Sequence, residues 1–551
     1  MPPAAPSPSP SSPFPSASPS LYPDLDATAL TAFAAALESG ECAGLPPARA
    51  AEVEAVRAVA VFSRGKVTGA DGDLLDAALW RHTGPGPRPA VVMPAPWTDL
   101  GWLAYAVQAA RFAAGGYDVL AYSPRGFAAS EGHADFAGPL DVTDGRHALD
   151  HLLERAAGPV TRIGFLGVSY GAGIAQLVAA HDARVDAVAA LSGWGDLGEV
   201  LRENSTRRTA AAHALLTSAP RARLSRPTER ALENVLAGRD LHETLAWAER
   251  RSPFTHLKEL GRRQVAVFCA HAWHETLFPA GQVLRTFQEL SGPKRIDLSI
   301  GDHCGPELTG LPGLPNRIWT DARRWFDHHL AGDDNGIDGE GEVLSEVMWS
   351  RALEPSPTWP VPTRHIRRLH LTGTGELADR PDPGWAAGVL CGVGAPVAVA
   401  EAAARAGHAE LAGRPRPYPA AAGMDRTAAA VWTAAPATTT TRLRGTPRLR
   451  VTYRAANSGS TFVAYLLDLA PDGSARLISH APFSDLDAPP DSLVSADIDL
   501  QPTAYDLPPG HRAMLALTPQ DPLYADANLP RATLSFTSPE PTPSYVELPV
   551  G

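Results

Sequence analysis

The stretch TRIGFLGVSYGAGIAQLVAAH (residues 161–181) decides the fold that we predict for this chain. An apolar strand runs into an Ala-rich helix through Gly167-Val168-Ser169-Tyr170-Gly171, a G-x-S-x-G pattern. In this context the turn is so tight that the serine takes strained backbone angles, while the glycines avoid clashes with the neighbouring strand and helix. The helix N-terminus favours the negative charge that develops in acyl transfer. Ser169 is therefore a candidate nucleophile with the backbone N–H of Tyr170 as oxyanion donor; the alternative is an idle serine in a small-residue turn.

Apolar runs and helical segments alternate on both sides of this turn. The first two runs predict a hairpin across GKVTGADGD, and later near-continuous runs predict strands buried on both faces of a parallel sheet with connecting helices. The runs span residues 56–64, 74–82, 89–96, 117–124, 161–169, 185–193, 264–271 and 295–302. Residues 26–56 before them have helical spacing.

One long connection and one change in the predicted secondary structure divide the chain. The connection before residue 264 is roughly 65 residues long, and insertions of such length are usually functional, so we expect a helical cap at about 197–262. From about residue 345, short strands with Gly- and Pro-rich turns predict an all-β jelly roll. The predicted fold class is α/β: an α/β-hydrolase domain (26–345) with a cap, followed by a C-terminal jelly roll (346–551).

The cap is rich in arginine. We interpret these side chains as a solvated face or, as the alternative, an anion-binding site. They are Arg202, Arg207, Arg208, Arg221, Arg223, Arg226 and Arg230.

Composition narrows the class of protein. The 551 residues carry a formal net charge of −12, which argues against a nucleic-acid partner. The four cysteines form no CxxC pair, and no apolar run approaches the ~20 residues that a bilayer span needs. Residues 1–25, rich in Pro and Ser, lack the basic and apolar regions of a secretory signal and predict disorder. We expect a cytoplasmic location and no membrane partner.

A serine nucleophile needs a base and an acid, which in this fold follow it in chain order, each after a strand. His303 comes directly after RIDLSIGD, read as the last strand of the sheet, and Glu275 follows QVAVFCAH. Glu275 is predicted to orient the His303 imidazole and to stabilise its charged form. Asp302 is expected to hold the loop. The alternatives are a surface-loop histidine and a solvent-facing glutamate.

The segment CAHAWHETLFPAG (269–281) also permits a metal hypothesis, because His271, His274 and Glu275 stand close together. The order HxxHE matches neither HExxH nor HxxEH, and His271 is expected to lie in the strand. We therefore expect no metal site and no cofactor.

With these residues in place, the chain resembles the serine hydrolases of the Xaa-Pro dipeptidyl-peptidase (S15) and cocaine-esterase (CocE/NonD) type. The resemblance runs from about Val67 to the C-terminus. It rests on GADGDLLDAALWRH, VVMPAPW, GYDVLAYSPRGFAASEG, GVSYGA, WHETLFP, GDHCG, WFDHHLAGDDNGI, RLRGTPRLRVTY and TAYDLPPGHRAMLAL. It implies Ser169 as nucleophile, Glu275 at the acid position and His303 as base, with a cap and jelly roll walling the site.

Three positions depart from the family pattern. Glu275 stands where aspartate is usual, and Ser123 replaces an acidic residue before Pro124-Arg125-Gly126. Arg125 is interpreted as structural. Trp97 stands where cocaine-esterase relatives carry a tyrosine that completes the oxyanion hole, so its indole or backbone N–H is the second candidate donor, and a pocket wall is the alternative.

The function predicted is therefore a serine hydrolase that cleaves an ester or amide bond through an acyl-enzyme. The expected substrate is a small ester or amide or a short peptide; nothing in the sequence indicates the oligomeric state. An Xaa-Pro-type dipeptidyl-peptidase, a thioesterase or a related acyltransferase is the alternative within this class. A non-catalytic jelly-roll binding protein is the alternative outside it.

Overall fold

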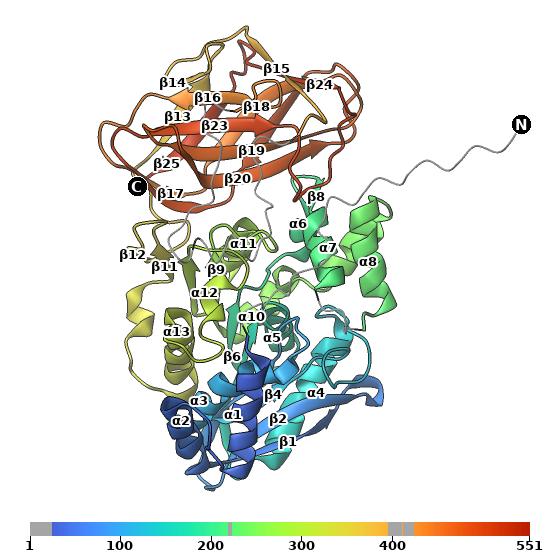
Figure 1. Cartoon of the computed structure of the whole chain (residues 1–551), viewed down its shortest axis with the longest axis vertical. Helices are drawn as coiled ribbons and strands as arrows, with labels where there is room; N and C mark the ends of the chain where they lie inside the picture. Colours follow the sequence, from blue (N-terminus) through green and yellow to red (C-terminus); the bar gives the residue numbers. More distant parts are fainter. Residues whose placement is uncertain (1–24, 219–222, 395–409, 411–423) are drawn as a thin grey trace, which may run out of the picture.

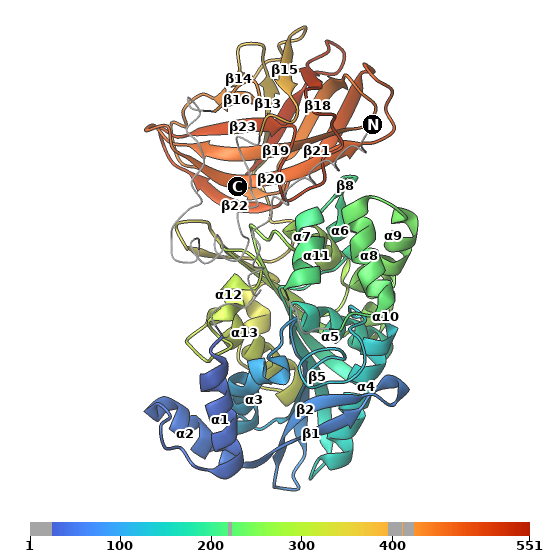
Figure 2. The ribbon, with the colours of Figure 1, turned by 45° about the vertical axis from the view of Figure 1, so that its right-hand side comes forward.

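The computed structural model describes residues 25–218, 223–394, 410 and 424–551 (Figure 1). All but the last residue of the predicted disordered N-terminus, and Arg221 of the cap, lie outside this range. An α/β domain forms one end of the molecule and a β-rich domain the other, with the cap and α11 (Ala280–Glu289) beside the junction (Figures 1 and 2). Within the described residues, no helix has the length and apolar character that a bilayer crossing requires.

The α/β domain is built on a mixed sheet in the order β1-β2-β4-β3-β5-β6-β9-β10-β11-β12. The predicted hairpin is confirmed, because β1 and β2 pair antiparallel. The strands from β4 to β11 are parallel, as near-continuous apolar runs predict. The bounds are β1 Ala60–Thr68, β2 Leu74–His82, β3 Arg88–Pro94, β4 Asp118–Tyr122, β5 Val160–Val168, β6 Val185–Leu191, β9 Ala266–Ala272, β10 Lys294–Ser299, β11 Val343–Glu346 and β12 Leu353–Ser356.

Helices cover both faces of this sheet because successive strand residues point to opposite sides. Val91 packs into a cluster with residues of α1, α2, α3 and α13, whereas the next residue, Val92, packs with α4, α5 and α11. The helices are α1 Ala27–Ser39, α2 Pro47–Arg57, α3 Ala106–Ala114, α4 Pro139–Arg155, α5 Tyr170–His181, α12 Gly305–Leu308 and α13 Arg317–Phe326. Shorter turns are η1 Ala70–Gly72, η2 Gly101–Tyr105, η4 Asp327–Ala331 and η5 Ile337–Glu340.

The long connection between β6 and β9 is mainly helical, as its composition predicts. It also contains a short hairpin, β7 (Arg202–Glu203) with β8 (Thr206–Arg207), which points to the β-rich domain. Its helices are α6 Leu197–Leu201, α7 Thr209–Thr217, α8 Arg226–Ala237, α9 Leu241–Glu249, η3 Pro253–His256 and α10 Leu257–Arg263.

The C-terminal part is β-rich, which confirms the all-β prediction for it. The Pro-Asp-Gly hairpin is formed by β19 and β20, whose paired strands contain a bulge at Leu466/Leu467. The strands are β13 His365–Leu371, β14 Glu376–Ala378, β15 Ala386–Leu390, β16 Ala430–Ala434, β17 Thr441–Gly445, β18 Arg448–Ala455, β19 Ser460–Leu469, β20 Ala475–Asp485, β21 Val494–Asp499, β22 Thr503–Leu507, β23 Arg512–Thr518, β24 Thr533–Thr537 and β25 Tyr545–Val550.

Two predictions about individual strands need correction. The strand before His303, β10, is not the last of its sheet, because β11 pairs with it and β12 follows antiparallel. The predicted domain boundary at residue 345 therefore falls inside β11, and residues 353–356 belong to the first sheet. The run 56–64 is also not one strand: α2 extends to Arg57 and β1 begins at Ala60.

Candidate active site

Ser169 lies in the sharp turn between β5 and α5. Its backbone has φ 55° and ψ −115°, a conformation that costs a non-glycine residue on the order of 1–3 kcal/mol. A Cβ on Gly167 would lie 2.1 Å from the backbone of Gly171, and a Cβ on Gly171 would lie 2.1 Å from the carbonyl oxygen of Pro94. Both positions therefore require glycine, because the neighbouring backbone comes too close for a Cβ. This is the reason why the G-x-S-x-G pattern has glycines there.

A chain of hydrogen bonds joins the three predicted residues. The Ser169 Oγ lies 2.9 Å from His303 Nε2, and His303 Nδ1 lies 3.0 and 3.1 Å from the two carboxylate oxygens of Glu275. All three side chains are buried. A glutamate in the acid position thus reaches the histidine with both oxygens.

The loop that carries Glu275 is fixed by its own backbone amides and by Asp302. Glu275 Oε1 accepts hydrogen bonds from the N–H groups of Leu277 (3.0 Å) and Phe278 (3.2 Å). Asp302 Oδ1 accepts from the amides of Thr276 (2.8 Å) and His303 (2.7 Å), and from the Thr276 hydroxyl (2.9 Å). Asp302 therefore holds the loop of Glu275 and the loop of His303 against each other, which is the structural role expected for it.

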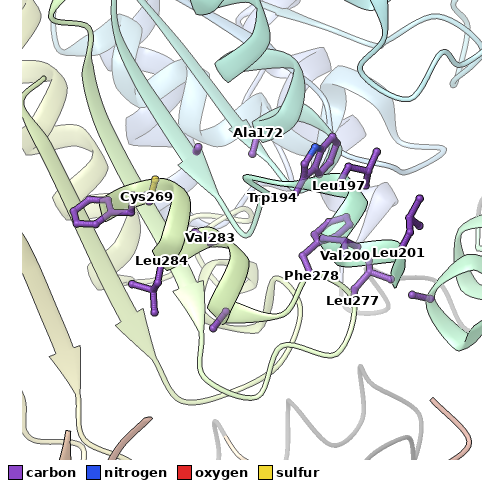
Figure 3. Close-up of a cluster of buried hydrophobic side chains, with 14 of the residues drawn as sticks. Ala172, Trp194, Leu197, Val200, Leu201, Cys269, Leu277, Phe278, Val283 and Leu284 are labelled. Carbon is purple, nitrogen blue, oxygen red and sulfur yellow. The ribbon is translucent and has the colours of Figure 1, made fainter. Parts of the chain in front are cut away.

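Apolar side chains seat the same loop against the cap. Phe278 packs on Trp194 with ring centroids 5.1 Å apart, and it meets the His303 ring edge-on at 5.2 Å. Figure 3 shows Leu277 and Phe278 beside Val200 and other buried residues of the cap. Burial of this cluster removes water from one side of the candidate triad, so the charges there are weakly screened.

Electrostatics couple His303 and Glu275. Burial disfavours the imidazolium, yet Cys304 and Glu275 raise the pKa of His303 well above its usual value. Burial works against the Glu275 carboxylate as well, but the charge of His303 holds the pKa of Glu275 below its usual value. Each charge of the buried pair therefore stabilises the other.

The two residues that carry the candidate oxyanion donors are in contact through their rings. Tyr170 is the first residue of α5, so its backbone N–H has no acceptor within the helix, while its hydroxyl donates to Asp141 at 2.5 Å. The rings of Trp97 and Tyr170 meet edge-on at 5.1 Å. The indole N–H of Trp97 is buried and has no hydrogen-bond partner in the described part of the chain.

The structure gives the two histidines near Glu275 partners of their own. His271 lies in β9 and its Nε2 is 2.7 Å from the carbonyl oxygen of Phe278. The Nδ1 of His274 lies 3.0 and 3.2 Å from the carboxylate of Glu410. No group of three or more His, Cys, Asp or Glu side chains suited to a metal ion occurs among the described residues.

Sequence reasoning missed several buried groups beside the triad. Glu410 comes from an Ala-rich stretch that gives no signal for a buried hydrogen bond to His274, and the sequence places Arg208 among the other cap arginines. Glu307, in α12, accepts a hydrogen bond from the Ser192 hydroxyl at 2.8 Å, and burial raises its pKa to about 7. Only its position four residues after His303 could have drawn attention to it.

The comparisons with known proteins agree with this architecture. Residues 71–305 match the sequence profile of the X-Pro dipeptidyl-peptidase (S15 family), and residues 335–547 match that of the X-Pro dipeptidyl-peptidase C-terminal non-catalytic domain. The cocaine esterase of Rhodococcus sp. is 24% identical over 365 residues, which cover 55% of this chain and 61% of that protein. The chain spans about half the length of the curated mycobacterial relatives that it matches.

Solved structures share the fold over nearly the whole chain. A CocE/NonD family hydrolase from Staphylococcus aureus is 13% identical, with a TM-score of 0.68 over 89% of this chain and 94% of that one. An aminopeptidase from the marine sediment archaeon Thaumarchaeota archaeon is 17% identical, with a TM-score of 0.68 over 88% of this chain and 96% of that one. The resemblance read from the sequence motifs is confirmed, and this chain belongs to the X-Pro dipeptidyl-peptidase (S15) and CocE/NonD family of α/β-hydrolases.

Proposed function

We propose that this chain is a serine hydrolase that cleaves an ester or amide bond through an acyl-enzyme, with Ser169 as nucleophile, His303 as base and Glu275 as acid. The observation that carries the proposal is the continuous hydrogen-bond chain from Ser169 Oγ through both nitrogens of His303 to the Glu275 carboxylate. This order and geometry are those of a nucleophile with its base and an orienting carboxylate.

In the first half of the reaction, Ser169 Oγ attacks the carbonyl carbon while its proton passes to His303 Nε2. The backbone N–H of Tyr170 and the indole N–H of Trp97 donate to the oxyanion of the tetrahedral intermediate. When the intermediate collapses, the alcohol or amine leaves with the proton from His303, and the acyl group remains on Ser169 as an ester.

In the second half, water enters and gives a proton to His303 as it attacks the acyl ester. Collapse of the second intermediate returns that proton to Ser169 Oγ and releases the carboxylic acid. Throughout, Glu275 keeps the His303 Nδ1–H directed at itself and stabilises the imidazolium that forms twice in each cycle. No cofactor or metal takes part in these steps.

The substrate class that we propose is a small ester or amide, or a short peptide. An ester is the bond cut by the Rhodococcus relative named cocaine esterase, whereas the matching family profiles are named for a dipeptidyl-peptidase. The profile match therefore supports an Xaa-Pro-type dipeptidyl-peptidase as the second candidate. A panel of p-nitrophenyl acyl esters of graded length and Xaa-Pro or other aminoacyl p-nitroanilides separates the two.

Ser169→Ala tests the proposal directly. We expect this variant to lose turnover of the panel and covalent labelling by a fluorophosphonate, with an unchanged circular dichroism spectrum and thermal midpoint. Labelling of the variant at the wild-type rate would overturn the assignment of the nucleophile. Absence of labelling in the wild-type protein would favour a non-catalytic binding protein instead.

A further inference from the structure

Arg208 is a fully buried arginine of the cap that reaches the loop of the triad acid. Its exposed fraction is 1%, and its Nη1 donates to the carbonyl oxygen of Thr276 at 3.1 Å. Thr276 is the residue directly after Glu275. Burying a guanidinium costs desolvation free energy, which its hydrogen bonds and charge contacts must offset. The groups that make these contacts are therefore held in place around Arg208.

The other contacts of Arg208 hold it from two sides. Its Nη2 donates to the carboxylate of Glu203, at the end of β7. Its guanidinium carbon lies 5.0 Å from the ring centre of Tyr524, which belongs to the β-rich domain. The Tyr524 hydroxyl shares a 3.0 Å hydrogen bond with His480 of β20, so the ring itself is fixed.

A second link from the β-rich domain ends on the other side of the acid loop. The Nε2 of Gln501 donates to Glu203, and its Oε1 accepts from the backbone N–H of Gly281 at 2.8 Å. Gly281 lies in the first turn of α11, directly after the acid loop. Cap, acid loop and β-rich domain thus meet through one buried polar network.

The residue before Glu275 has an anchor as well. His274 and Glu410 form a buried pair, with 2% and 1% of their side chains exposed. Residue 410 follows β15 in the sequence of the C-terminal part. The residues on both sides of Glu275 are therefore held by groups that lie outside the α/β sheet and its helices.

We propose that Arg208 is a positioning residue, which places Glu275 for its hydrogen bonds to His303 and makes that placement depend on the β-rich domain. The proposal rests on the triad proposed above. Because Glu275 acts only through His303, loss of the Arg208 contact shifts the acid and slows every proton transfer at His303. A displacement near 1 Å costs up to about 10²-fold in rate.

The first test removes the contact between Arg208 and Thr276 without leaving the carboxylate of Glu203 buried and unpaired. In Arg208→Met/Glu203→Gln, the methionine fills space and the neutral glutamine still accepts from Gln501. The readouts are the second-order rate of Ser169 labelling by a fluorophosphonate, kcat and KM on p-nitrophenyl butyrate, and the thermal midpoint. We expect labelling and kcat to fall about tenfold to a hundredfold with KM near the wild-type value.

The same pair in a Glu275→Gln background separates positioning from a general effect on the fold. If Arg208 acts through Glu275, the pair lowers the labelling rate of Glu275→Gln by less than about twofold, because the placement of the acid no longer matters. An equal fold-loss in both backgrounds, or no loss in the wild-type background, overturns the proposal. Failure of Ser169→Ala to lose labelling overturns the triad instead, so the two failures are distinguishable.

Two further variants complete the experiment. Arg207→Met is the matched control, because Arg207 donates to the carbonyls of Val235 and Leu236 within the cap and does not touch the acid loop; its labelling rate should equal the wild-type rate. Tyr524→Leu removes the ring over Arg208 and should lower the rate severalfold, with no additional loss in the Arg208→Met/Glu203→Gln protein. An unchanged rate in Tyr524→Leu overturns the dependence on the β-rich domain.

Discussion

The carboxylate of Glu275 meets the Nδ1 of His303 with both oxygens, at 3.0 and 3.1 Å, although a glutamate is one methylene longer than the aspartate usual at this place in the family. In the turn after β9, Glu275 Oε1 also accepts from the amides of Leu277 and Phe278. Glu275 is thus bound to its own loop as well as to His303, and Cys304 and Glu275 together raise the pKa of His303 against the effect of burial.

Replacing Glu275 by glutamine should slow the reaction and change its pH dependence. His303 must be neutral to accept a proton. Burial lowers the pKa of His303, but Cys304 and Glu275 raise it, and the result lies well above the usual value. Wild-type activity should therefore be lost as pH falls through a midpoint above 6.5. In Glu275→Gln, kcat should fall by about 10²–10⁴-fold, and the midpoint should move to lower pH because the raising charge is gone.

The measurement is kcat/KM, or the rate of fluorophosphonate labelling, between pH 5 and 9. A wild-type midpoint at or below 6.5, or a midpoint that does not move in Glu275→Gln, contradicts this account of the pair. Glu275→Asp serves as the control, since it keeps the charge and changes only the reach.

Trp97→Phe separates the two interpretations of Trp97. The indole N–H is buried with no partner among the described residues, beside the ring of Tyr170. If the indole N–H is an oxyanion donor, its removal should lower kcat by about 10²-fold or more and leave KM nearly unchanged, because the donor acts in the transition state. If KM rises for long acyl groups while kcat is kept, Trp97 is a wall of the pocket.

Glu307→Gln should change stability in a pH-dependent way. Burial raises the pKa of Glu307 to about 7, so the folded state holds a proton that the unfolded state releases near pH 4.5. Stability from this protonated carboxyl is fully present below pH 4.5 and is lost as pH rises through about 7, a change of up to roughly 3 kcal/mol. The glutamine keeps the acceptor for Ser192 and avoids the buried charge.

Thermal midpoints measured at pH 5 and pH 8 check this expectation: Glu307→Gln should match the wild type at pH 5 and exceed it by a few degrees at pH 8. Glu154→Gln, at an exposed glutamate, should shift neither value. An equal shift of the thermal midpoint at both pH values would show that ionisation of the buried Glu307 carboxyl does not cause the pH-dependent change in stability.

The local pattern was enough to predict the parallel sheet and the turn at Ser169, because both depend on runs of neighbouring residues and on glycines at fixed spacing. Chain order within the fold was enough to propose His303 and Glu275, which the structure brings within hydrogen-bond distance. Their catalytic roles, the division into domains, the cytoplasmic location and the jelly-roll description remain predictions.

The missed features depend on contacts between distant segments. Arg208 was interpreted as part of a solvated or anion-binding arginine face, yet it is buried against Glu203 and Tyr524, which no local pattern reveals. The strand β12 was assigned to the second domain because strands dominate after residue 345, but its partner β11 keeps it in the first sheet. A strand's own sequence does not determine which sheet it joins.

The position of Tyr524 more than 200 residues after His303 in the sequence has a consequence for biosynthesis. Domains generally fold as units during synthesis, beginning with the N-terminal one. The sheet that carries Ser169, Glu275 and His303 is translated well before β20, Gln501 and Tyr524 exist. A nascent chain on the ribosome therefore carries Ser169, the proposed nucleophile, before the segments that complete the buried contacts around Glu275 have been made.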